Sequence, residues 1–568
     1  MFWHNKKTRH SSIDPDEIFL DSSNLPQFDT HQFEGRLEKP ISKTALVLLW
    51  VFFAVAAAAG IARLADLALA RGVSFRAIAE DNRLLRTPLF AERGVIFDRT
   101  GVELAWNEPF PERDFAARAY AGIKGLAHVL GFVNYPAKDS SGFYYKETFE
   151  GMDGIERAYD SILAGKNGIM LVETNAKNEV RSTASHTPVL NGDSIILSVD
   201  ARVAEELYSR IEGVVREAGF QGGAGVIMDI QTGEILALAS FPGYDQRTLS
   251  DGGADGVAAL ARDARKPFLN RVTAGLYTPG SIVKPFLALA ALQEQLISPE
   301  EKILSTGSIA IPHPYLPGEE SVFLDWKAHG WVSMRDALAV SSNVYFYEIA
   351  GGYKEQKGLG IGKVETYMNL FGFGKKTGVD FLGEESGVIP NPRWKEKIFK
   401  EEWRLGDTYN TAIGQYGFQV TPLQAVRAVA AIANGGKLLK PRIVIKIFSD
   451  TEMIDGGKVT PITWSQLPID ESYYAVVKEG MRRGVLEGTA KGLDIPAIAV
   501  AAKTGTAQIG TTKKFVHSWV TGFFPYEKPR YAFAVVMERG PSGNLIGALS
   551  AFRGLVEWMA EHTPEYLY

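Results

Sequence analysis

The sequence predicts an α+β fold joined to a single membrane-spanning helix, and three observations predict it. An uncharged apolar stretch occupies residues 44–62. Pairs of apolar runs about a short turn occur at 225–240 and 519–537, a pattern typical of antiparallel β-hairpins. Helical patterns surround these runs, at residues 201–219, 282–296 and 546–562. We therefore expect an antiparallel sheet flanked by helices.

Length and composition limit the classes of protein that the chain can belong to. At 568 residues it is too long for one hydrophobic core, so two or three domains are expected. The net charge of −5 gives no reason to expect nucleic acid as a partner. The absence of cysteine excludes disulfides, thiolate metal sites and cysteine catalysis.

The apolar stretch is long enough to cross a bilayer. Its nineteen uncharged residues would span roughly 28 Å as a helix. A cleaved signal peptide is the alternative, but its polar leader would be unusually long and its apolar core too extended. We expect an uncleaved anchor after a mostly disordered tail, residues 1–43. The flanking basic residues do not decide the orientation, because Arg36, Lys39 and Lys43 face Arg63, Arg71 and Arg76.

Residues 63–190 form a second compositional zone without an evident catalytic set. A helical pattern over 63–85 leads into short β-like stretches that flank a turn at Arg99-Thr100-Gly101. Residues 154–168 have the pattern of a helix ended by glycine. Neither segment gathers a nucleophile, a base or metal ligands, so we interpret both as structural.

The first candidate for chemistry is Ser281-x-x-Lys284, which follows a Pro279-Gly280 turn and opens a buried helix over 282–296. A serine at a helix N-terminus lies where developing negative charge is stabilised. Residues three apart share a helix face, so Lys284 can present its amine to the Ser281 hydroxyl as a base beside a nucleophile. Alone, the pattern also fits a serine N-cap beside a solvated lysine.

Two further motifs strengthen the catalytic interpretation. Ser341-Ser342-Asn343 lies between a helical segment, 331–340, and an aromatic one, 344–349. Lys503-Thr504-Gly505-Thr506 directly follows the apolar run 495–502, which we expect to be a buried strand. A second Lys-Thr-Gly, at 376–378, lies among glycines with no strand pattern before it, and we interpret it as a loop. The ordered set of three motifs is typical of penicillin-binding proteins and serine β-lactamases.

The resemblance extends along most of the chain and is to class B penicillin-binding proteins, which are membrane-anchored peptidoglycan D,D-transpeptidases. Arg93-Gly-x-Ile-x-Asp-Arg99 and Gly154-Ile-Glu resemble the pedestal, or dimerisation, domain of that family. Asp229-x-x-Thr-Gly-Glu234 and Asn270-Arg271 resemble its catalytic domain. Residues 393–397, 406–410 and 413–424 are most similar to the elongation subtype, penicillin-binding protein 2; the septal transpeptidase of division is the alternative.

The resemblance implies a domain order and a topology. Residues 1–43 would be a cytoplasmic tail and 44–63 the transmembrane anchor. Residues 64–190 would form an elongated, mostly β pedestal, and 191–568 the transpeptidase domain. Everything after about residue 63 would lie outside the cytoplasmic membrane. A membrane glycan polymerase of the shape, elongation, division and sporulation family is the implied partner.

The resemblance also implies an acyl-transfer mechanism on stem peptides that end in D-Ala-D-Ala. Ser281 would attack the penultimate carbonyl, and Lys284 would take its proton, provided that burial and the Lys503 charge lower the pKa of that amine. Ser341 would relay a proton to the leaving amine. Asn343 would hold Lys284 and the substrate amide.

Substrate binding is assigned to the third motif by the same resemblance. The backbone N–H groups of Ser281 and Thr506 would stabilise the oxyanion. Lys503 and the hydroxyls of Thr504 and Thr506 would bind the terminal carboxylate. Gly505 would let the strand approach the substrate backbone. No cofactor is implied, and β-lactams should acylate Ser281.

Some relatives carry zinc between the first two motifs, with a cysteine at the middle of the second. This chain keeps Asp325 and His329 but has Ser342 at that position, so we expect no metal and interpret the pair as exposed loop residues. His517, after the third motif, could line the cleft or make a structural bond, and is left out of the catalytic set.

Two other classes of function remain open. A β-lactam sensor would need a cytoplasmic signalling domain, for which 43 polar residues are too few, and a hydrolase would not need the pedestal zone. A non-catalytic scaffold for the glycan polymerase would not need all three motifs, which are intact here.

Overall fold

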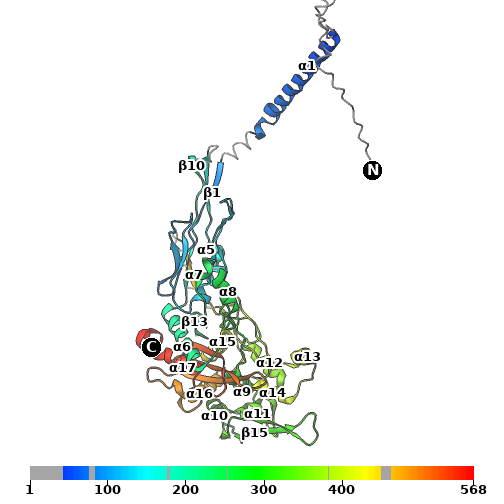
Figure 1. Cartoon of the computed structure of the whole chain (residues 1–568). Helices are drawn as coiled ribbons and strands as arrows, with labels where there is room; N and C mark the ends of the chain where they lie inside the picture. Colours follow the sequence, from blue (N-terminus) through cyan, green and yellow to red (C-terminus); the bar gives the residue numbers. More distant parts are fainter. Residues whose placement is uncertain (1–41, 76–83, 175–179, 253, 382, 450–461) are drawn as a thin grey trace, which may run out of the picture. The chain divides into compact units, whose positions relative to one another are not determined.

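A computed structural model describes residues 42–75, 84–174, 180–252, 254–381, 383–449 and 462–568. The chain divides into two compact units, one of residues 1–85 with 173–179 and the other of 86–172 with 180–568 (Figure 1). The predicted disordered tail falls almost wholly on residues 1–41, which lie outside the described residues.

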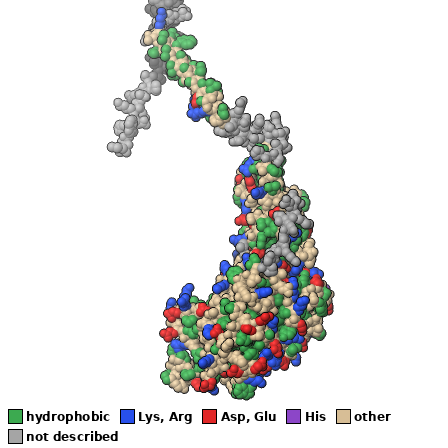
Figure 2. All heavy atoms as spheres, turned by 180° about the vertical axis from the view of Figure 1, so that it is seen from behind, with side chains coloured by type: hydrophobic (Ala, Val, Ile, Leu, Met, Phe, Trp, Pro, Cys, Tyr) green, Lys and Arg blue, Asp and Glu red, His purple; other side chains and the backbone are tan. Residues whose placement is uncertain are grey.

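The first unit contains the predicted apolar helix, α1 (Lys43–Ala65), which continues as a short π-helix, η3 (Asp66–Ala70). The Ser42 hydroxyl caps α1 by accepting a hydrogen bond from the Ala45 N–H at 3.1 Å. No side chain of α1 is buried, and hydrophobic side chains cover most of its surface (Figure 2). Among the described residues, Lys43–Ala70 is the one helix long and apolar enough to cross a membrane.

The helical pattern predicted for 63–85 is wrong at its end. Strand β1 (Leu84–Leu89) begins inside it, and residues 76–83 are outside the described part. Strand β1 contains Thr87-Pro88, and a β-branched residue before proline favours extended backbone over helix. Strands β1, β9 (Gly168–Thr174) and β10 (Val180–Thr187) form a three-stranded sheet.

In the second unit, a five-stranded sheet joins residues far apart in the chain. Its order is β19-β11-β2-β3-β4, with bounds Val444–Phe448, Ser194–Leu197, Ile96–Phe97, Glu103–Glu108 and Ala117–Tyr120. The predicted turn at residues 99–101 is confirmed: it connects β2 and β3, and the Asp98 carboxylate accepts hydrogen bonds from Thr100 and Val102. Because the sheet combines strands from before and after residue 190, the boundary at 190/191 stays a prediction.

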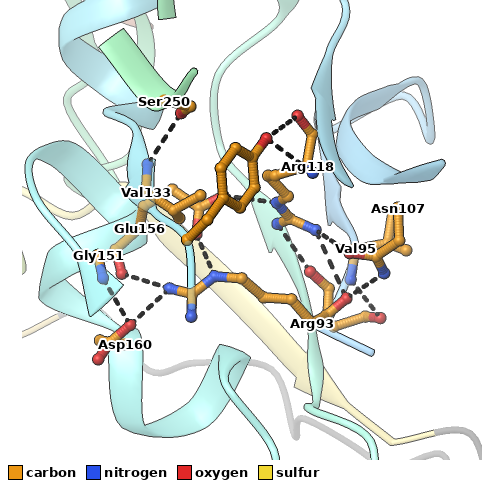
Figure 3. A network of polar contacts seen from close by, with 12 residues as sticks. Arg93, Val95, Asn107, Arg118, Val133, Gly151, Glu156, Asp160 and Ser250 are labelled. Atoms are coloured by element: carbon orange, nitrogen blue, oxygen red, sulfur yellow. Dashed lines mark hydrogen bonds and ion pairs between the residues drawn. The ribbon is translucent and has the colours of Figure 1, made fainter. Parts of the chain in front are cut away.

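A buried charge network lies beside this sheet (Figure 3). The Glu156 carboxylate pairs with Arg93 Nε at 2.5 Å and with Arg118 Nε at 2.7 Å, and all three side chains are fully buried. Arg93 also reaches Asp160 at 2.7 Å.

The helix predicted over 154–168 is instead two short helices, α4 (Gly154–Ala158) and α5 (Asp160–Leu163), because Tyr159 between them leaves the helical region at φ −116°.

The second sheet is antiparallel throughout, with order β13-β12-β23-β22-β21. Its strands are β12 (Gly222–Asp229), β13 (Ile235–Phe241), β21 (Ala501–Ile509), β22 (Phe515–Phe524) and β23 (Tyr531–Pro541). Both predicted hairpins, β12–β13 and β22–β23, are confirmed. Strand β21 is an edge of this sheet, and it carries the third motif.

Helices pack on this sheet as predicted. Helices α6 (Ala201–Ala218) and α17 (Ala548–His562) pack against each other and against the sheet. Helix α15 (Pro422–Ala433) contacts β12, β22 and β23, and α16 (Glu471–Leu486) contacts β21. The predicted helices at 201–219 and 546–562 are therefore confirmed, and so is the α+β fold with an antiparallel sheet flanked by helices.

The remaining elements connect these layers. Before residue 300 they are α3 (Ala127–Leu130), β5 (Val133–Asn134), β6 (Ala137–Lys138), β7 (Tyr144–Lys146), β8 (Glu150–Gly151), α7 (Gln246–Ser250), α8 (Ala254–Arg262), η4 (Gly280–Val283) and α9 (Lys284–Gln293). After it they are β14 (Ile303–Ser305), β15 (Ser308–Pro312), β16 (Glu320–Leu324), β17 (Gly330–Val332), α10 (Met334–Val340), α11 (Asn343–Gly351), α12 (Gly360–Leu370), α13 (Pro392–Phe399), α14 (Leu405–Ala412), β18 (Lys437–Leu439), β20 (Thr463–Gln466), η5 (Lys491–Leu493) and η6 (Pro564–Tyr566).

Candidate active site

Ser281 lies in a single 3₁₀ turn, η4, ahead of the buried helix α9. The helix was predicted to begin at Ser281, but its α-helical part begins three residues later, at Lys284. Pro285, which has no N–H to donate, occupies the first turn of α9. The turn before it is tight: Gly280 has φ +57°, and its N–H donates to the Gly414 carbonyl at 3.0 Å. Ser281 faces a cleft.

The Lys284 amine joins the first motif to the second. The side chain is fully buried, and its Nζ donates to the Ser341 carbonyl at 2.8 Å and to Asn343 Oδ1 at 2.7 Å. Ser341 Oγ lies 3.4 Å from the same nitrogen. Ser341 ends α10 in the left-handed conformation, at φ +58°, which turns its carbonyl toward the amine. Within the described part of the chain, no hydrogen bond joins the Ser281 side chain to Lys284.

Burial lowers the pKa of Lys284 to about 7, and the Asp325 carboxylate opposes that shift. The sequence predicted that the Lys503 charge would help to lower it. Instead, the repulsion between the two lysines acts on Lys503. Burial first, and then the Lys284 charge, lower the pKa of Lys503 well below its usual value. An amine with a pKa near 7 is neutral often enough at neutral pH to accept a proton.

The third motif lies within the edge strand β21. The predicted strand over 495–502 is wrong in its position, because β21 begins only at Ala501 and contains the motif itself. Lys503 is buried, and its Nζ donates to the Thr504 carbonyl at 3.0 Å. The Thr504 hydroxyl donates to that of Thr489 at 2.7 Å. A Cβ at Gly505 would lie 2.8 Å from the Pro279 carbonyl oxygen, so this glycine makes room for the nucleophile turn.

A cleft of about 1390 Å³ brings the motifs together. Its lining includes residues of all three motifs, namely Ser281, Ser341, Asn343, Thr504, Gly505 and Thr506. The two lysines are buried behind these residues. Apolar side chains complete the walls: Val322, Phe323, Leu324, Trp326, Tyr347, Ile413, Trp519, Leu545 and Leu549. The arrangement can hold a peptide against an edge strand beside a serine hydroxyl and a buried amine.

Asp325 is the functional residue that sequence reasoning misjudged. Its Oδ2 accepts four hydrogen bonds: from the hydroxyls of Ser305 at 3.1 Å and Ser342 at 2.7 Å, and from the N–H groups of Asn343 at 2.8 Å and Val344 at 3.0 Å. The carboxylate therefore caps α11 and fixes the second motif. No sequence spacing indicates this, because Asp325 reaches the helix from 18 residues away.

The exposed-loop interpretation of Asp325 and His329 is wrong, since their side chains are 0% and 2% exposed. His329 Nε2 lies 3.6 Å from Asp325 Oδ1. The residues present do not fit a zinc ion. Two of the groups around the carboxylate are serine hydroxyls that donate hydrogen bonds to it, and no cluster of three His, Cys, Asp or Glu residues gathers in the described ranges.

Two other sequence features lie outside the catalytic set. The Lys376-Thr377-Gly378 segment is a loop, as predicted, and its Thr377 and Gly378 N–H groups donate to the Glu384 carboxylate. His517 makes a structural bond: its Nδ1 accepts from the Arg539 N–H at 3.2 Å. Burial, and then the Arg539 charge, lower the pKa of His517 to about 4.

Comparison with known proteins identifies the class. The family of the penicillin binding protein transpeptidase domain matches residues 223–553, and that of the penicillin-binding protein dimerisation domain matches 113–197. The chain belongs to the penicillin-binding proteins.

Its relatives point to one subtype. Over 464 residues the chain is 31% identical to the peptidoglycan D,D-transpeptidase MrdA of Salmonella typhimurium (strain SL1344), an alignment that covers 76% of this chain and 71% of that protein. The structure of Pseudomonas aeruginosa PBP2 in complex with WCK 5153 is similar with a TM-score of 0.68 and 30% identity, over 84% of this chain and 98% of that one. The predicted resemblance to penicillin-binding protein 2 is confirmed.

A third comparison is with a structure that describes the coordination of polymerization and crosslinking by a peptidoglycan synthase complex. It has a TM-score of 0.69 and 25% identity, and it covers 91% of this chain and 98% of that one.

Proposed function

We propose that this chain is a serine-type peptidoglycan D,D-transpeptidase that cross-links stem peptides during cell elongation. One observation carries the proposal: a buried amine, Lys284, is held by Ser341 and Asn343 behind a cleft that also exposes Ser281 and an edge strand. The MrdA relative supports the elongation role over the septal one.

Acylation begins with proton transfer. Lys284 Nζ takes the proton of Ser281 Oγ, and that oxygen forms a bond to the carbonyl carbon of the penultimate D-Ala. The oxyanion is stabilised by the N–H groups of Ser281 and Thr506. As the C–N bond breaks, a proton passes from Lys284 through Ser341 to the nitrogen of the departing D-Ala. The pKa of Lys284 near 7 supports its role in both directions.

The second half-reaction reverses the proton movements. An acceptor amine from a neighbouring strand loses a proton to Lys284 and attacks the ester carbonyl of the acyl-enzyme. The new C–N bond forms, the ester C–O bond breaks, and Ser281 Oγ regains its proton. Lys503 and the hydroxyls of Thr504 and Thr506 bind the terminal carboxylate of the donor. β-Lactams would form the same ester with Ser281.

The anchor and the comparisons support a proposed location and a proposed partner. Helix α1 would cross the cytoplasmic membrane once, with the catalytic domain on the extracytoplasmic side. Residues 64–190 would form the pedestal and 191–568 the transpeptidase domain. The similarity to a chain from a peptidoglycan synthase complex supports a membrane glycan polymerase as the partner. Failure of both the intact chain and Ser281→Ala to co-purify with such a polymerase would count against the partnership.

Turnover of a natural donor tests the reaction. The full chain in detergent is incubated with a pentapeptide ending in D-Ala-D-Ala and an acceptor amine, and both D-alanine release and cross-linked product are measured. Wild type is expected to form both, and Ser281→Ala neither. Ser518→Ala is the matched control, because Ser518 lines the same cleft outside the motifs. D-alanine release without cross-linked product would favour a hydrolase, and no release would favour a scaffold.

A further inference from the structure

Strand β21 offers one open edge to the cleft. Among the described strands it pairs with β22 alone, on one side, and Thr504, Thr506 and Gln508 line the cleft. An extended peptide can add to such an edge as a further strand, through its backbone N–H and C=O groups. In an antiparallel pair, every second residue turns both groups toward the same neighbour.

One side chain already occupies part of this edge. The amide of Gln415 faces the backbone of Gln508. In the orientation that its neighbours assign to it, with the donor toward an acceptor and the acceptor toward a donor, its nitrogen donates to the Gln508 carbonyl at 3.3 Å and its oxygen accepts from the Gln508 N–H at 3.1 Å. The side-chain amide thus makes the two hydrogen bonds that a neighbouring strand would make. Both residues line the cleft.

The Gln415 backbone is held in place by the turn that carries the nucleophile. Its N–H donates to the Asn410 carbonyl at 2.9 Å, and the preceding Gly414 carbonyl accepts from the Gly280 N–H at 3.0 Å. Gly414 has φ +72°, and a Cβ there would lie 2.1 Å from the Gly280 carbonyl oxygen. The amide is therefore presented to β21 by a fixed loop.

The hydrogen-bonding register of β21 indicates which donor residue would otherwise occupy the position of the Gln415 amide. Because Gln508 turns its N–H and C=O outward, Thr506 and Thr504 do so as well. A donor whose carboxylate lies at Lys503 and whose scissile carbonyl lies at the Thr506 N–H runs antiparallel to β21. The residue two positions before its penultimate D-Ala would then pair with Gln508, where the Gln415 amide lies.

We propose that Gln415 is a specificity-determining residue. It limits the length of donor peptide that can pair with β21 as an additional β-strand. Only the pair at Thr506 stays open to the donor backbone. Donor residues further toward the amino end form no backbone hydrogen bonds with β21. The donor chain can therefore turn away from β21 at that point without losing binding energy. This inference rests on the proposed function, since it concerns the donor of that reaction.

Thioester donors of two lengths test the inference on the full chain in detergent. The short donor is acetyl-D-Ala-D-thiolactate, and the extended donor has two α-linked L-Ala residues between the acetyl group and D-Ala. Acylation forms the bond from Ser281 Oγ to the acyl carbon, breaks the C–S bond and releases a thiol. A thiol reagent reads the release, and the chain contributes no background because it has no cysteine.

The measured quantity is the ratio of kcat/KM for the extended donor to that for the short one. Wild type and the control Gln231→Ala, whose side chain accepts a hydrogen bond from Arg530 at 2.9 Å and is not among the residues that line the cleft, are expected to give a ratio within about twofold of one. Gln415→Ala is expected to raise the ratio about fivefold or more, because two backbone hydrogen bonds become available. Gln415→Glu, which cannot donate to the Gln508 carbonyl, is expected to raise it too and decides the question if Gln415→Ala does not fold.

Two results would overturn the inference: a ratio that stays at the wild-type value in the folded Gln415 variants, or a wild-type ratio already well above fivefold. Failure of the proposed function looks different, because wild type would then release thiol from neither donor.

Discussion

Two opposing electrostatic effects act on the pKa of Lys284. Its amine is removed from water, which favours the neutral form, and its two short hydrogen bonds to oxygen acceptors hold it in place. The Asp325 carboxylate favours the charged form. The result is a pKa of about 7, at which the amine can both take and return a proton.

The rate of acylation should therefore rise with pH up to about neutrality, with a single inflection near the pKa of Lys284. Below a pKa of about 7 the amine is protonated and cannot accept the Ser281 proton, so the second-order rate constant for benzylpenicillin should fall about tenfold per pH unit. Above that pKa the rate should level. Stopped-flow or quenched acylation between pH 5.5 and 8.5 measures the limb, and a flat profile over this range would contradict the role of Lys284 as the base.

Asp325→Asn should slow acylation with the fold retained. The carboxylate holds the N–H groups of Asn343 and Val344, and hydrogen bonds to charged groups contribute about 1.5–3 kcal/mol. We expect a decrease of roughly tenfold to a hundredfold. The limb near pH 7 should also move to lower pH, because Asp325 raises the pKa of Lys284.

The matched control is Asp336→Asn, which removes a carboxylate that caps α10 and pairs with Arg483 at 2.8 Å without lining the cleft. It should lower the melting temperature and leave acylation within about threefold. If Asp325→Asn and the control acylate at equal rates, Asp325 does not position the second motif.

At the scale of elements, local periodicity in the sequence predicted which helices and strands are present, but not the residues at which some of them begin. The β12–β13 and β22–β23 hairpins and helices α6 and α17 follow from alternation and helical spacing. The starts of α9 and β21 were missed, because tertiary pairing with Gly414 and with β22 sets them. The split between α4 and α5 was also missed, since it depends on the backbone of Tyr159, which leaves the helical region at φ −116° inside a segment with a continuous helical pattern.

The network around Glu156 gives a prediction of stability. Burial raises the pKa of Glu156, but Arg118 and Arg93 outweigh burial and lower it. Its contribution is therefore complete above the unfolded pKa of about 4.3 and is lost as pH falls through the folded pKa. Glu156→Gln removes the carboxylate that two buried guanidinium groups share, although Arg93 keeps its pair with Asp160, and should cost about 3–5 kcal/mol at pH 7.

Urea unfolding of wild type and Glu156→Gln measures that cost. Glu103→Gln on β3 is the control: its side chain is exposed, so the change should stay within about 0.5 kcal/mol. Equal stability of wild type and Glu156→Gln would mean that the network does not stabilise the fold.

At the scale of the whole molecule, the order of motifs predicted the catalytic domain, but no local signal places its boundary. Strand β11 pairs in parallel with β2 and antiparallel with β19, so one sheet spans residues 96–448. Side chains add further links: Tyr159 donates to Asp380 at 3.2 Å, and Tyr244 donates to Asp153 at 2.8 Å. Sequence reasoning could not see these contacts because they join distant segments.

A fragment of residues 191–568 should consequently be less stable than one of residues 86–568. It loses the β2 partner of β11 and the Tyr159 and Asp153 contacts. We expect its melting temperature to be lower by roughly 5 °C or more. Differential scanning calorimetry compares the two fragments, and equal melting temperatures would show that the predicted boundary separates independent domains.

The most direct test of the account is intact-protein mass spectrometry of the full chain after incubation with benzylpenicillin. Wild type should carry one stable penicilloyl adduct and Ser281→Ala none, which would assign the nucleophile and slow deacylation together. An adduct on Ser281→Ala, or no adduct on wild type, would contradict the central claim that Ser281 forms the acyl-enzyme.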